Sequence, residues 1–324
     1  VRFEDCRPAD EVKLSNYGSV VVTGRNAVGL IAGSVSSGGL AHQVDANDFS
    51  NGAPDHPKNR VIYANYVKNG NINEAEFGAE KRLKFTAEPP NTAGNNVTVL
   101  NDAGARVSVG NADGSSQRAY GILAQSIGSS GGVVFGEGTW THGSAGGIAG
   151  HGRKVSVTNK GDVKVIGESA VGILAQSIGG GGGAGGSSSA KFVALGGSGG
   201  AGGNGGSVFL DFHGGSSTVT NGDFAVGVIG HSIGGGGGHG GGAKSTGLFY
   251  DQAIGGSGGD GGHGGLIRVT STGKSFSTAG QHAHGMVLQS IGGGGGVGGS
   301  AKSHTYGLVL AISVASGGTG GKGG

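Results

Sequence analysis

The chain has 324 residues, of which 81 are glycine and only 5 are proline. Collagen is excluded, because its triple helix needs glycine at every third position together with abundant proline. The net charge is +2, from 22 Lys and Arg against 20 Asp and Glu without a basic cluster, so we expect no nucleic-acid partner. The single cysteine, Cys6, excludes an internal disulfide framework. No apolar run is long enough to span a bilayer, and we expect no direct membrane insertion of this chain.

Residues 1–39 form the first predicted rung of a repeating fold. Short alternating stretches at residues 13–14 and 20–22 flank a turn at 16–18, and a second turn leads into Ala27–Val35. Runs of this length with period-two alternation between Asn and Gly turns are typical of short β-strands. We therefore expect three strands and two corners here.

Residues 40–95 do not follow this pattern. They hold all the prolines except Pro8 and much of the charge, and Arg60–Tyr66 reads as a strand. We interpret this insertion as an extra rung or as a small subdomain that caps one end of the fold.

Residues 96–324 carry repeated rungs, marked by a short sequence that recurs four times. Its copies are Ala119–Gly128, Ala170–Gly179, Ala225–Gly234 and Ala283–Gly292, and Ala27–Val35 is a degenerate version. Two shorter strands and two turns precede each copy, so three strands and two corners span roughly 24 residues, the length of one β-helix rung. The sequence predicts an all-β fold, a parallel β-helix of about five to six rungs.

Stacking of the rungs follows from their size. A single rung cannot bury its own inward Val, Ile and Leu, whereas rungs about 4.8 Å apart satisfy each other's backbone groups and align like residues. We expect Gln125, Gln176 and Gln289 to fall in register, with Gly33 and His231 at the same position. The same register would align four serines, Ser126, Ser177, Ser232 and Ser290.

Glycine-rich stretches separate the rungs. The clearest leads out over residues 179–186, has a tip at 187–195 and returns over 196–206 in a Gly-Gly-X pattern. An extended helix with three residues per turn places every X on one edge and leaves bare backbone on its other faces. Because glycine is costly to order, this composition favours close backbone approach. We expect protruding arms that stack as a polyglycine II-like layer; flexible loops are the alternative.

The arm tips carry the aromatic residues that are the best candidates for ligand or self-association contacts. Exposed aromatic side chains mark interaction surfaces. The candidates are Phe135, Trp140, Phe192, Phe249, Tyr250 and Tyr306. An alternative is that these side chains pack on each other as a second small core, and the two roles can coexist.

The repeated Gly-Ile-Leu-Ala-Gln-Ser-Ile-Gly run, followed by further glycines and preceded by Val-x-Val-x-Asn-x-Gly, resembles the passenger domains of glycine-rich autotransporters of Gram-negative bacteria. Residues 119–132, 153–206, 207–265 and 266–324 carry the resemblance, and residues 40–95 do not. It implies a right-handed β-helical stalk, often an adhesin, on the bacterial surface. It also implies secretion and anchoring through a C-terminal outer-membrane barrel absent from this chain. The chain lacks an initiating Met and stops within a glycine pattern, so we expect a fragment.

Catalytic and metal motifs are weak in this sequence. The Gly-x-Ser-x-Gly matches around Ser198 and Ser257 lie inside glycine repeats, where the strand and helix of a nucleophile elbow are not expected. Gly273-Lys274-Ser275 lacks the upstream glycine of a phosphate-binding loop. The acidic residues Asp211, Asp223, Asp251 and Asp260 are predicted at scattered turn, corner, tip and arm positions. We expect no catalytic residue, no cofactor and no metal.

The sequence therefore favours a non-enzymatic cell-surface adhesin or stalk that acts through multivalent contacts. Its partners would be a host-surface protein or glycan, or the same protein on neighbouring bacteria. The alternatives are a polysaccharide-degrading enzyme on a β-helix, which needs an acidic ladder in one cleft, and a purely structural spacer. Ice or mineral binding would need a repeated Thr-x-Thr face, and Thr218-Val219-Thr220 occurs once.

Overall fold

The fold is described by a computed structural model. It describes residues 11–36, 41–45, 76–77, 83–84, 93–111, 113, 115–131, 133–137, 140–143, 145–215, 217–306 and 312–324. Every regular element in these ranges is a strand or an extended segment, and none is a helix that could cross a membrane. The predicted strand at residues 60–66 lies outside the described residues.

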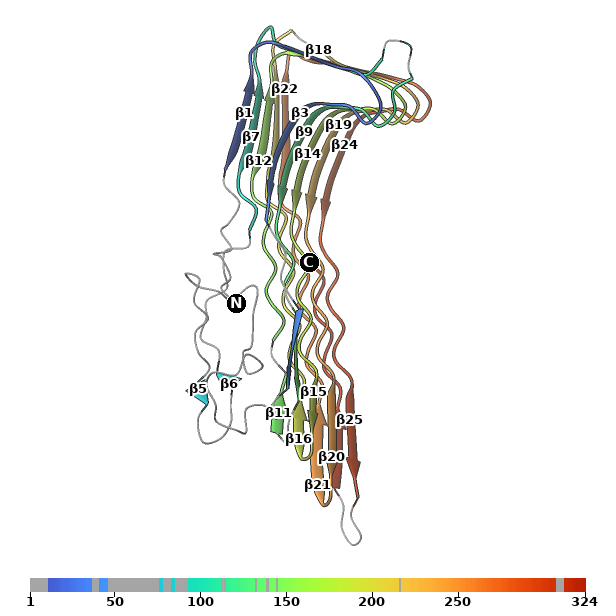
Figure 1. The fold of residues 1–324 in the computed structure, drawn as a ribbon. Coiled ribbons are helices and arrows are strands. Elements are labelled where there is room, and N and C mark those ends of the chain that lie inside the picture. Colours follow the sequence, from blue (N-terminus) through green and yellow to red (C-terminus); the bar gives the residue numbers. More distant parts are fainter. Residues whose placement is uncertain are drawn as a thin grey trace.

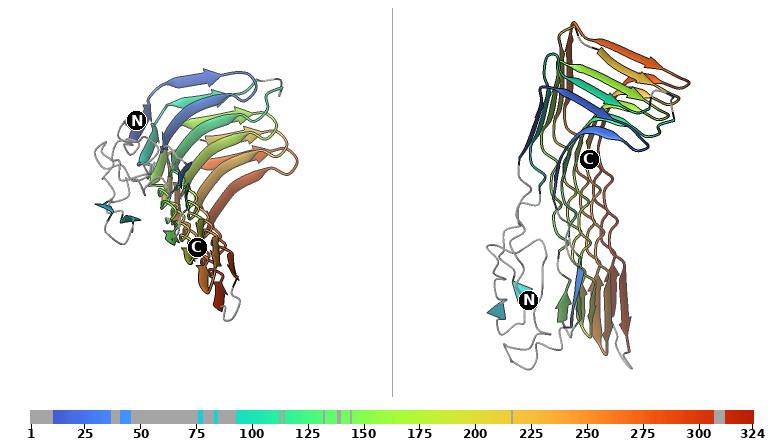
Figure 2. Two further views of the ribbon diagram at one scale, coloured as in Figure 1. Left: turned by 60° about the horizontal axis from the view of Figure 1, so that its bottom comes forward. Right: turned by 45° about the horizontal axis from the view of Figure 1, so that its top comes forward.

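The body of the molecule is a parallel β-helix of five rungs, as predicted. Each rung contributes one strand to each of three five-stranded parallel sheets, and Figures 1 and 2 show the rungs stacked side by side. Sheet 1 contains β1 (Val12–Asn16), β7 (Val97–Asn101), β12 (Val155–Asn159), β17 (Val208–His213) and β22 (Ile267–Thr272). Sheet 2 contains β2 (Ser19–Val22), β8 (Arg106–Val109), β13 (Asp162–Ile166), β18 (Ser217–Asn221) and β23 (Ser275–Ala279). Sheet 3 contains β3 (Val28–Val35), β9 (Tyr120–Ile127), β14 (Val171–Ile178), β19 (Val226–Ile233) and β24 (His284–Ile291).

The core lies between the three sheets. In the central rungs the strands alternate buried and partly exposed positions, because successive side chains of a strand point to opposite faces. Val99, Val157 and Leu210 occupy one register position of sheet 1, and all three are buried. Ile122, Ile173 and Val228 do the same in sheet 3. Apolar residues thus stack on equivalent residues of the neighbouring rungs.

Polar ladders hold the corners, and one lies where sheet 1 turns into sheet 2. Asn16 donates to Asn101, and Asn101 donates to Asn159, over 2.9 and 2.8 Å. The next rung places Phe212 at this register position, where its ring meets Phe276 edge-on at 4.9 Å. The amide ladder is thereby replaced by an aromatic contact at the C-terminal end of the stack.

The serines of sheet 3 fasten the arms to the body. Ser177 Oγ donates to the carbonyl of Arg153 and accepts the N–H of Gly206, both at 2.7 Å. Ser232 makes the same pair of bonds with Gly206 and Gly265. Each serine therefore bridges two returning arms where they enter sheet 1, which gives the predicted serine ladder a structural role.

The glycine-rich stretches are ordered arms that form two layers. The second, third, fourth and last arms leave the body after β9, β14, β19 and β24 as outgoing segments. Their returning segments run back towards sheet 1. Within a layer the chains run parallel: Gly179, Gly182 and Gly185 donate to the outgoing segment of the next arm. Between layers they run antiparallel, because Gly200 and Gly203 donate to Gly183 and Gly180. Donors recur every three residues in both directions, which confirms the polyglycine II-like arrangement.

The tips end in two small parallel sheets. One contains β15 (Ser188–Ala190), β20 (Ala243–Gly247) and β25 (Ala301–Thr305). The other contains β11 (Trp140–His142), β16 (Val193–Leu195), β21 (Tyr250–Ile254) and β26 (Ile312–Ser316). Figure 1 places both at the far end of the arms, away from the three large sheets.

The segment 40–95 begins and ends as a first arm. Its strand β4 (Ala41–Asp45) pairs in parallel with β10 (Val133–Glu137) of the second arm. At the other end, the N–H of Gly94 donates to His151 of the second arm. Strand β1 pairs directly with β7, so no rung is inserted between the first two. The short pair β5 (Glu76–Phe77) and β6 (Leu83–Lys84) is the other described part of this segment.

Candidate interaction surface at the arm tips

The turn at each tip is placed by hydrogen bonds to the tip of the neighbouring arm. Gln252 donates to the carbonyl of Phe192 over 2.8 Å, and Ile312 donates to that of Phe249 over 3.0 Å. Tyr306 likewise donates to Gly247 over 2.9 Å. Successive tip turns therefore lie one strand spacing apart, and their aromatic residues form a row rather than isolated points.

The described tip side chains are exposed and apolar. The exposed fractions are 61% for Leu248, 70% for Phe249, 45% for Tyr250 and 63% for Tyr306, and Phe192 is 40% exposed. Large apolar groups that gather at one end of a polar molecule are characteristic of contact surfaces. Four of the six predicted contact residues, Phe192, Phe249, Tyr250 and Tyr306, thus lie at the tips together with Leu248. We call these five residues the tip surface.

Phe135 and Trp140 are placed only through their backbones. Phe135 lies in β10 opposite Gln43, and Trp140 lies in β11 opposite Val193. Their side chains lie outside the described part of the structure.

A second small core does exist at the tips, but it consists of alanines. Ala190, Ala194, Ala243 and Ala253 are buried, with Ala301 packed against them. The two arm layers are hydrogen-bonded to each other, as Gly200 is to Gly183, so they approach far more closely than the ~10 Å that separates ordinary packed sheets, and the side chains buried between the tip sheets are small ones such as Ala, Ser and Asp. The aromatic residues are therefore excluded from this core and remain on the surface.

A buried carboxylate stiffens the tip. Asp251 is fully buried and accepts hydrogen bonds from the hydroxyls of Ser303 and Thr305, at 2.8 and 2.6 Å, and from the N–H of His304 at 2.7 Å. Burial alone raises the pKa of Asp251, but the bonds from Thr305, Ser303 and His304 outweigh it and lower the pKa to about 2. Asp251 is therefore charged at neutral pH and ties β21 to β25.

Side-chain contacts also orient two of the exposed rings. The ring of Tyr306 meets His304 edge-on, with centroids 4.5 Å apart. The Tyr250 hydroxyl donates to Gln252 Oε1 over 3.4 Å. These contacts reduce the freedom that the rings would lose on binding a partner.

Acidic residues meet elsewhere, in a cleft at the corner between sheets 2 and 3. Asp113, Glu168 and Asp223 line this cleft of about 450 Å³. Asp223 accepts the N–H of Gln281 at 2.8 Å, and Glu168 accepts an amide hydrogen of Gln117 at 3.3 Å. Hydrogen bonds from Ser115 lower the pKa of Asp113, opposite to the change that a general acid needs. Among the described residues, no group of three or more His, Cys, Asp or Glu could hold a metal.

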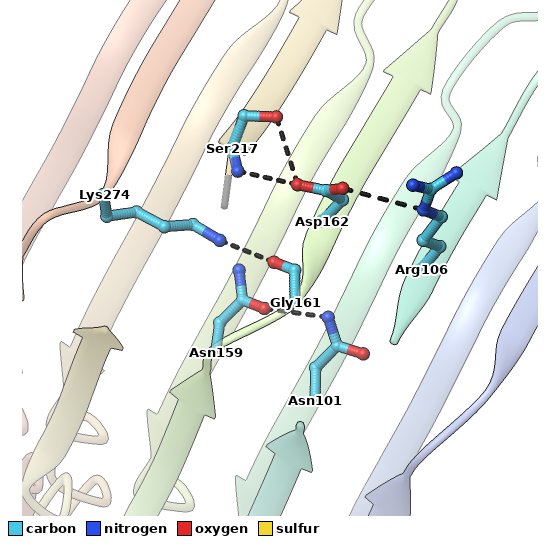
Figure 3. A network of polar contacts seen from close by, with 7 residues as sticks. All are labelled: Asn101, Arg106, Asn159, Gly161, Asp162, Ser217 and Lys274. Carbon is cyan, nitrogen blue, oxygen red and sulfur yellow. Dashed lines mark hydrogen bonds and ion pairs between the residues drawn. The ribbon is translucent and has the colours of Figure 1, made fainter. Parts of the chain in front are cut away.

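Lys274 belongs to the Gly-Lys-Ser sequence that lacks the upstream glycine of a phosphate-binding loop. Its side chain connects two rungs that are not neighbours. Its ammonium group donates to the carbonyl of Gly161, two rungs away, beside the carboxylate of Asp162 (Figure 3). Burial lowers the pKa of Lys274 to about 8, while the charge of Asp162 opposes that change. Asp162 in turn accepts the N–H of Ser217 and faces Arg106, 3.8 Å away. Sequence spacing could not reveal this network, because its members come from four rungs.

Comparison with known proteins gives no family for this chain. No protein-family model matches it, and neither the curated proteins nor the solved structures contain a significant match.

Proposed function

We propose that this chain is part of a cell-surface adhesin or stalk of the autotransporter passenger type, and that the tip surface makes its contacts. The observation that carries the proposal is the row of exposed Leu248, Phe249, Tyr250 and Tyr306 at the far end of ordered arms. The β-helix supports this role because it repeats, so each added rung adds a tip. The resemblance of the repeat to bacterial passenger domains supports the surface location.

Multivalency is the proposed mechanism. Each tip offers a small apolar area that alone would bind weakly. The arms hold the tips at fixed spacing, so a partner engaged by one tip meets the next at high effective concentration. The partner is a host-surface protein or glycan, or the same protein on a neighbouring bacterium.

Bead adhesion tests the proposal. Beads coated with the chain are mixed with one another and with cultured mammalian cells. A variant with serine at Leu248, Phe249, Tyr250 and Tyr306 should lose bead clumping or cell attachment by at least tenfold, because the apolar contact area is removed.

The matched control replaces equally exposed apolar residues of the β-helix body, Tyr17, Val21 and Ile31, with serine. It should adhere like the parent chain. Equal adhesion of the tip variant and the parent would reject the tip surface as the contact site. Absence of all adhesion by the parent would favour the spacer alternative.

A polysaccharide-degrading enzyme is the weaker alternative. Among the described residues, the acidic cleft of Asp113, Glu168 and Asp223 is the one feature that favours it. The hydrogen bonds of Glu168 and Asp223 connect neighbouring rungs at a corner, so both side chains already have a structural role. The cleft is lined by residues that adjoin β13 and β18 of the body, whereas the tip strands lie at the far end of the arms from the three large sheets (Figure 1).

A further inference from the structure

We infer that the end of the stack formed by residues 266–324 is a binding surface for one further β-helical rung that carries a Gly-Gly-X arm. The rung would add in parallel register to β22, β23 and β24 and to the last arm. The surface would then repeat the interface that the fourth rung makes with the fifth.

Glycine placement is the first observation. A Cβ at Gly255, Gly258 or Gly261 would overlap carbonyl oxygens of the last arm, so the fourth arm must have glycine at these positions. The equivalent positions of the last arm are Gly317, Gly320 and Gly323, where the nearest atom to a Cβ is 3.6 to 3.8 Å away. In sheet 3, a Cβ at Gly227 would lie 2.5 Å from the carbonyl of Gly285, whereas one at Gly285 has nothing within 4 Å. The last rung keeps four glycines that only a further arm and strand require.

Unsatisfied backbone donors are the second observation. In the fourth arm, the N–H groups of Gly234, Gly237 and Gly240 donate to the outgoing segment of the last arm, and those of Gly255, Gly258 and Gly261 donate to its returning segment. The equivalent donors of the last arm have no acceptor within the described ranges. They are the N–H groups of Gly292, Gly295, Gly298, Gly317, Gly320 and Gly323.

The exposed core is the third observation. Met286 occupies the inward register position of the fully buried Val228, and Leu288 occupies that of Gly230. Met286 is 37% exposed and Leu288 is 43% exposed, because no rung covers them. The partner must therefore present inward apolar side chains to sheet 3.

Together these observations specify the occupant. Along this edge, the free backbone donors follow the two-residue period of a β-strand in the three sheets and a three-residue period in the arm. A β-strand peptide would satisfy only the strand section, and an isolated glycine-rich peptide only the arm. A rung of the same construction satisfies both and covers Met286 and Leu288.

Amide hydrogen exchange of an extended chain tests the inference. A duplicate of residues 266–324 is appended after Gly324, and the duplicate carries Val297→Ile and Thr319→Ser at X positions so that its peptides differ in mass from the original ones. Mass spectrometry follows the original segments 292–300 and 317–324. We expect their exchange to slow by at least tenfold relative to the parent chain, because the edge donors gain acceptors.

A Gly317→Ala, Gly320→Ala and Gly323→Ala triple variant separates docking from folding. In the parent chain it should not lower the melting temperature, since the added methyls meet nothing closer than 3.6 Å. In the extended chain it should abolish the protection, whereas Thr319→Ala at an X position should retain it. Fast exchange in the extended chain, or protection that survives the triple variant, would overturn the inference. Dimerisation of the parent chain that protects the same segments would assign the edge to a second copy instead and overturn it too.

Discussion

At the scale of single residues, glycine in the arms has three distinct environments that recur every three positions. Gly199 faces the next arm, Gly200 faces the preceding one, and Ser198 between the pairs faces solvent. A Cβ at Gly199 or Gly200 would overlap a carbonyl oxygen. The Gly-Gly-X pattern is therefore a packing requirement at two positions and a free choice at the third.

This distinction gives a matched pair of substitutions. Gly199→Ala should lower the free energy of unfolding by about 1–3 kcal/mol, because the methyl group displaces the carbonyl of Gly238. Gly181→Ala occupies an X position, where the nearest atom is the Gly236 oxygen at 3.9 Å, and should be neutral or stabilise by up to about 1 kcal/mol through the unfolded chain. Urea denaturation followed by circular dichroism measures both. Equal destabilisation by the two substitutions would contradict the close packing assigned to Gly199 and the open environment assigned to Gly181.

At the scale of elements, the amide ladder of sheet 3 contains one residue that titrates. Gln125 donates to Gln176 over 2.7 Å, and Gln176 donates to Nδ1 of His231 over 3.1 Å. Burial lowers the pKa of His231 from its usual 6.5. A parallel case is His151, whose Nδ1 accepts the N–H of Asn204 at 2.8 Å and whose pKa is lowered by burial and then by Arg153.

Stability should therefore depend on pH. The unfolded chain binds these protons more readily than the folded chain, so the free energy of unfolding should fall as pH drops below about 6.5. Protonation of Nδ1 would also place a donor opposite the Gln176 side-chain amide at His231, and opposite the Asn204 N–H at His151. The double variant His231→Gln with His151→Asn gives each site the amide residue that the neighbouring rung has at the same position, Gln176 and Asn204. The free energy of unfolding should then depend less on pH. Thermal melts between pH 5 and pH 8 measure the slope, and an unchanged slope in the double variant would refute this assignment.

Two features of the elements follow directly from the sequence, and others do not. The register of sheet 3 follows from the repeated run, and the arms follow from the Gly-Gly-X pattern, because each is local and periodic. The Asp251 network joins β21 to β25 across more than fifty residues, so no local pattern marks it. Phe224 adopts a positive φ of 58° at a corner where glycine or asparagine would be expected. The alanine core of the tips depends on the distance between the two arm layers. That distance is set by hydrogen bonds between arms, so it cannot be predicted from one arm alone.

At the scale of the whole molecule, each rung with its arm is a nearly independent unit. Register is fixed by pairs such as Val155 with Val208 and Val208 with Ile267, so the strands of each rung pair only with those of the neighbouring rungs. In such proteins stability is approximately a sum over repeats and their interfaces.

Removal of one unit tests this. Deletion of residues 207–265 joins Gly206 to Leu266 and should leave a folded stack of four rungs with a smaller urea m-value, because less surface is buried. Deletion of residues 207–236 removes strands without their arm and should abolish cooperative unfolding. Loss of cooperative unfolding in both variants would show that the rungs are not separable units.

The arm segments form a lattice of hydrogen bonds within and between their two layers, and this lattice determines how the molecule responds to force. Its hydrogen bonds lie across the chain direction, so a load applied at a tip along the arm acts on all of them in shear at once. Because the lattice repeats every three residues, an arm that slips by one repeat, about 9 Å, meets equivalent acceptors and can bond again. Single-molecule pulling on a tip should then show extension in steps of this size, and a single abrupt rupture would contradict it. Such an arm dissipates mechanical work before its layers come apart, which fits the adhesive contact proposed for the tip surface.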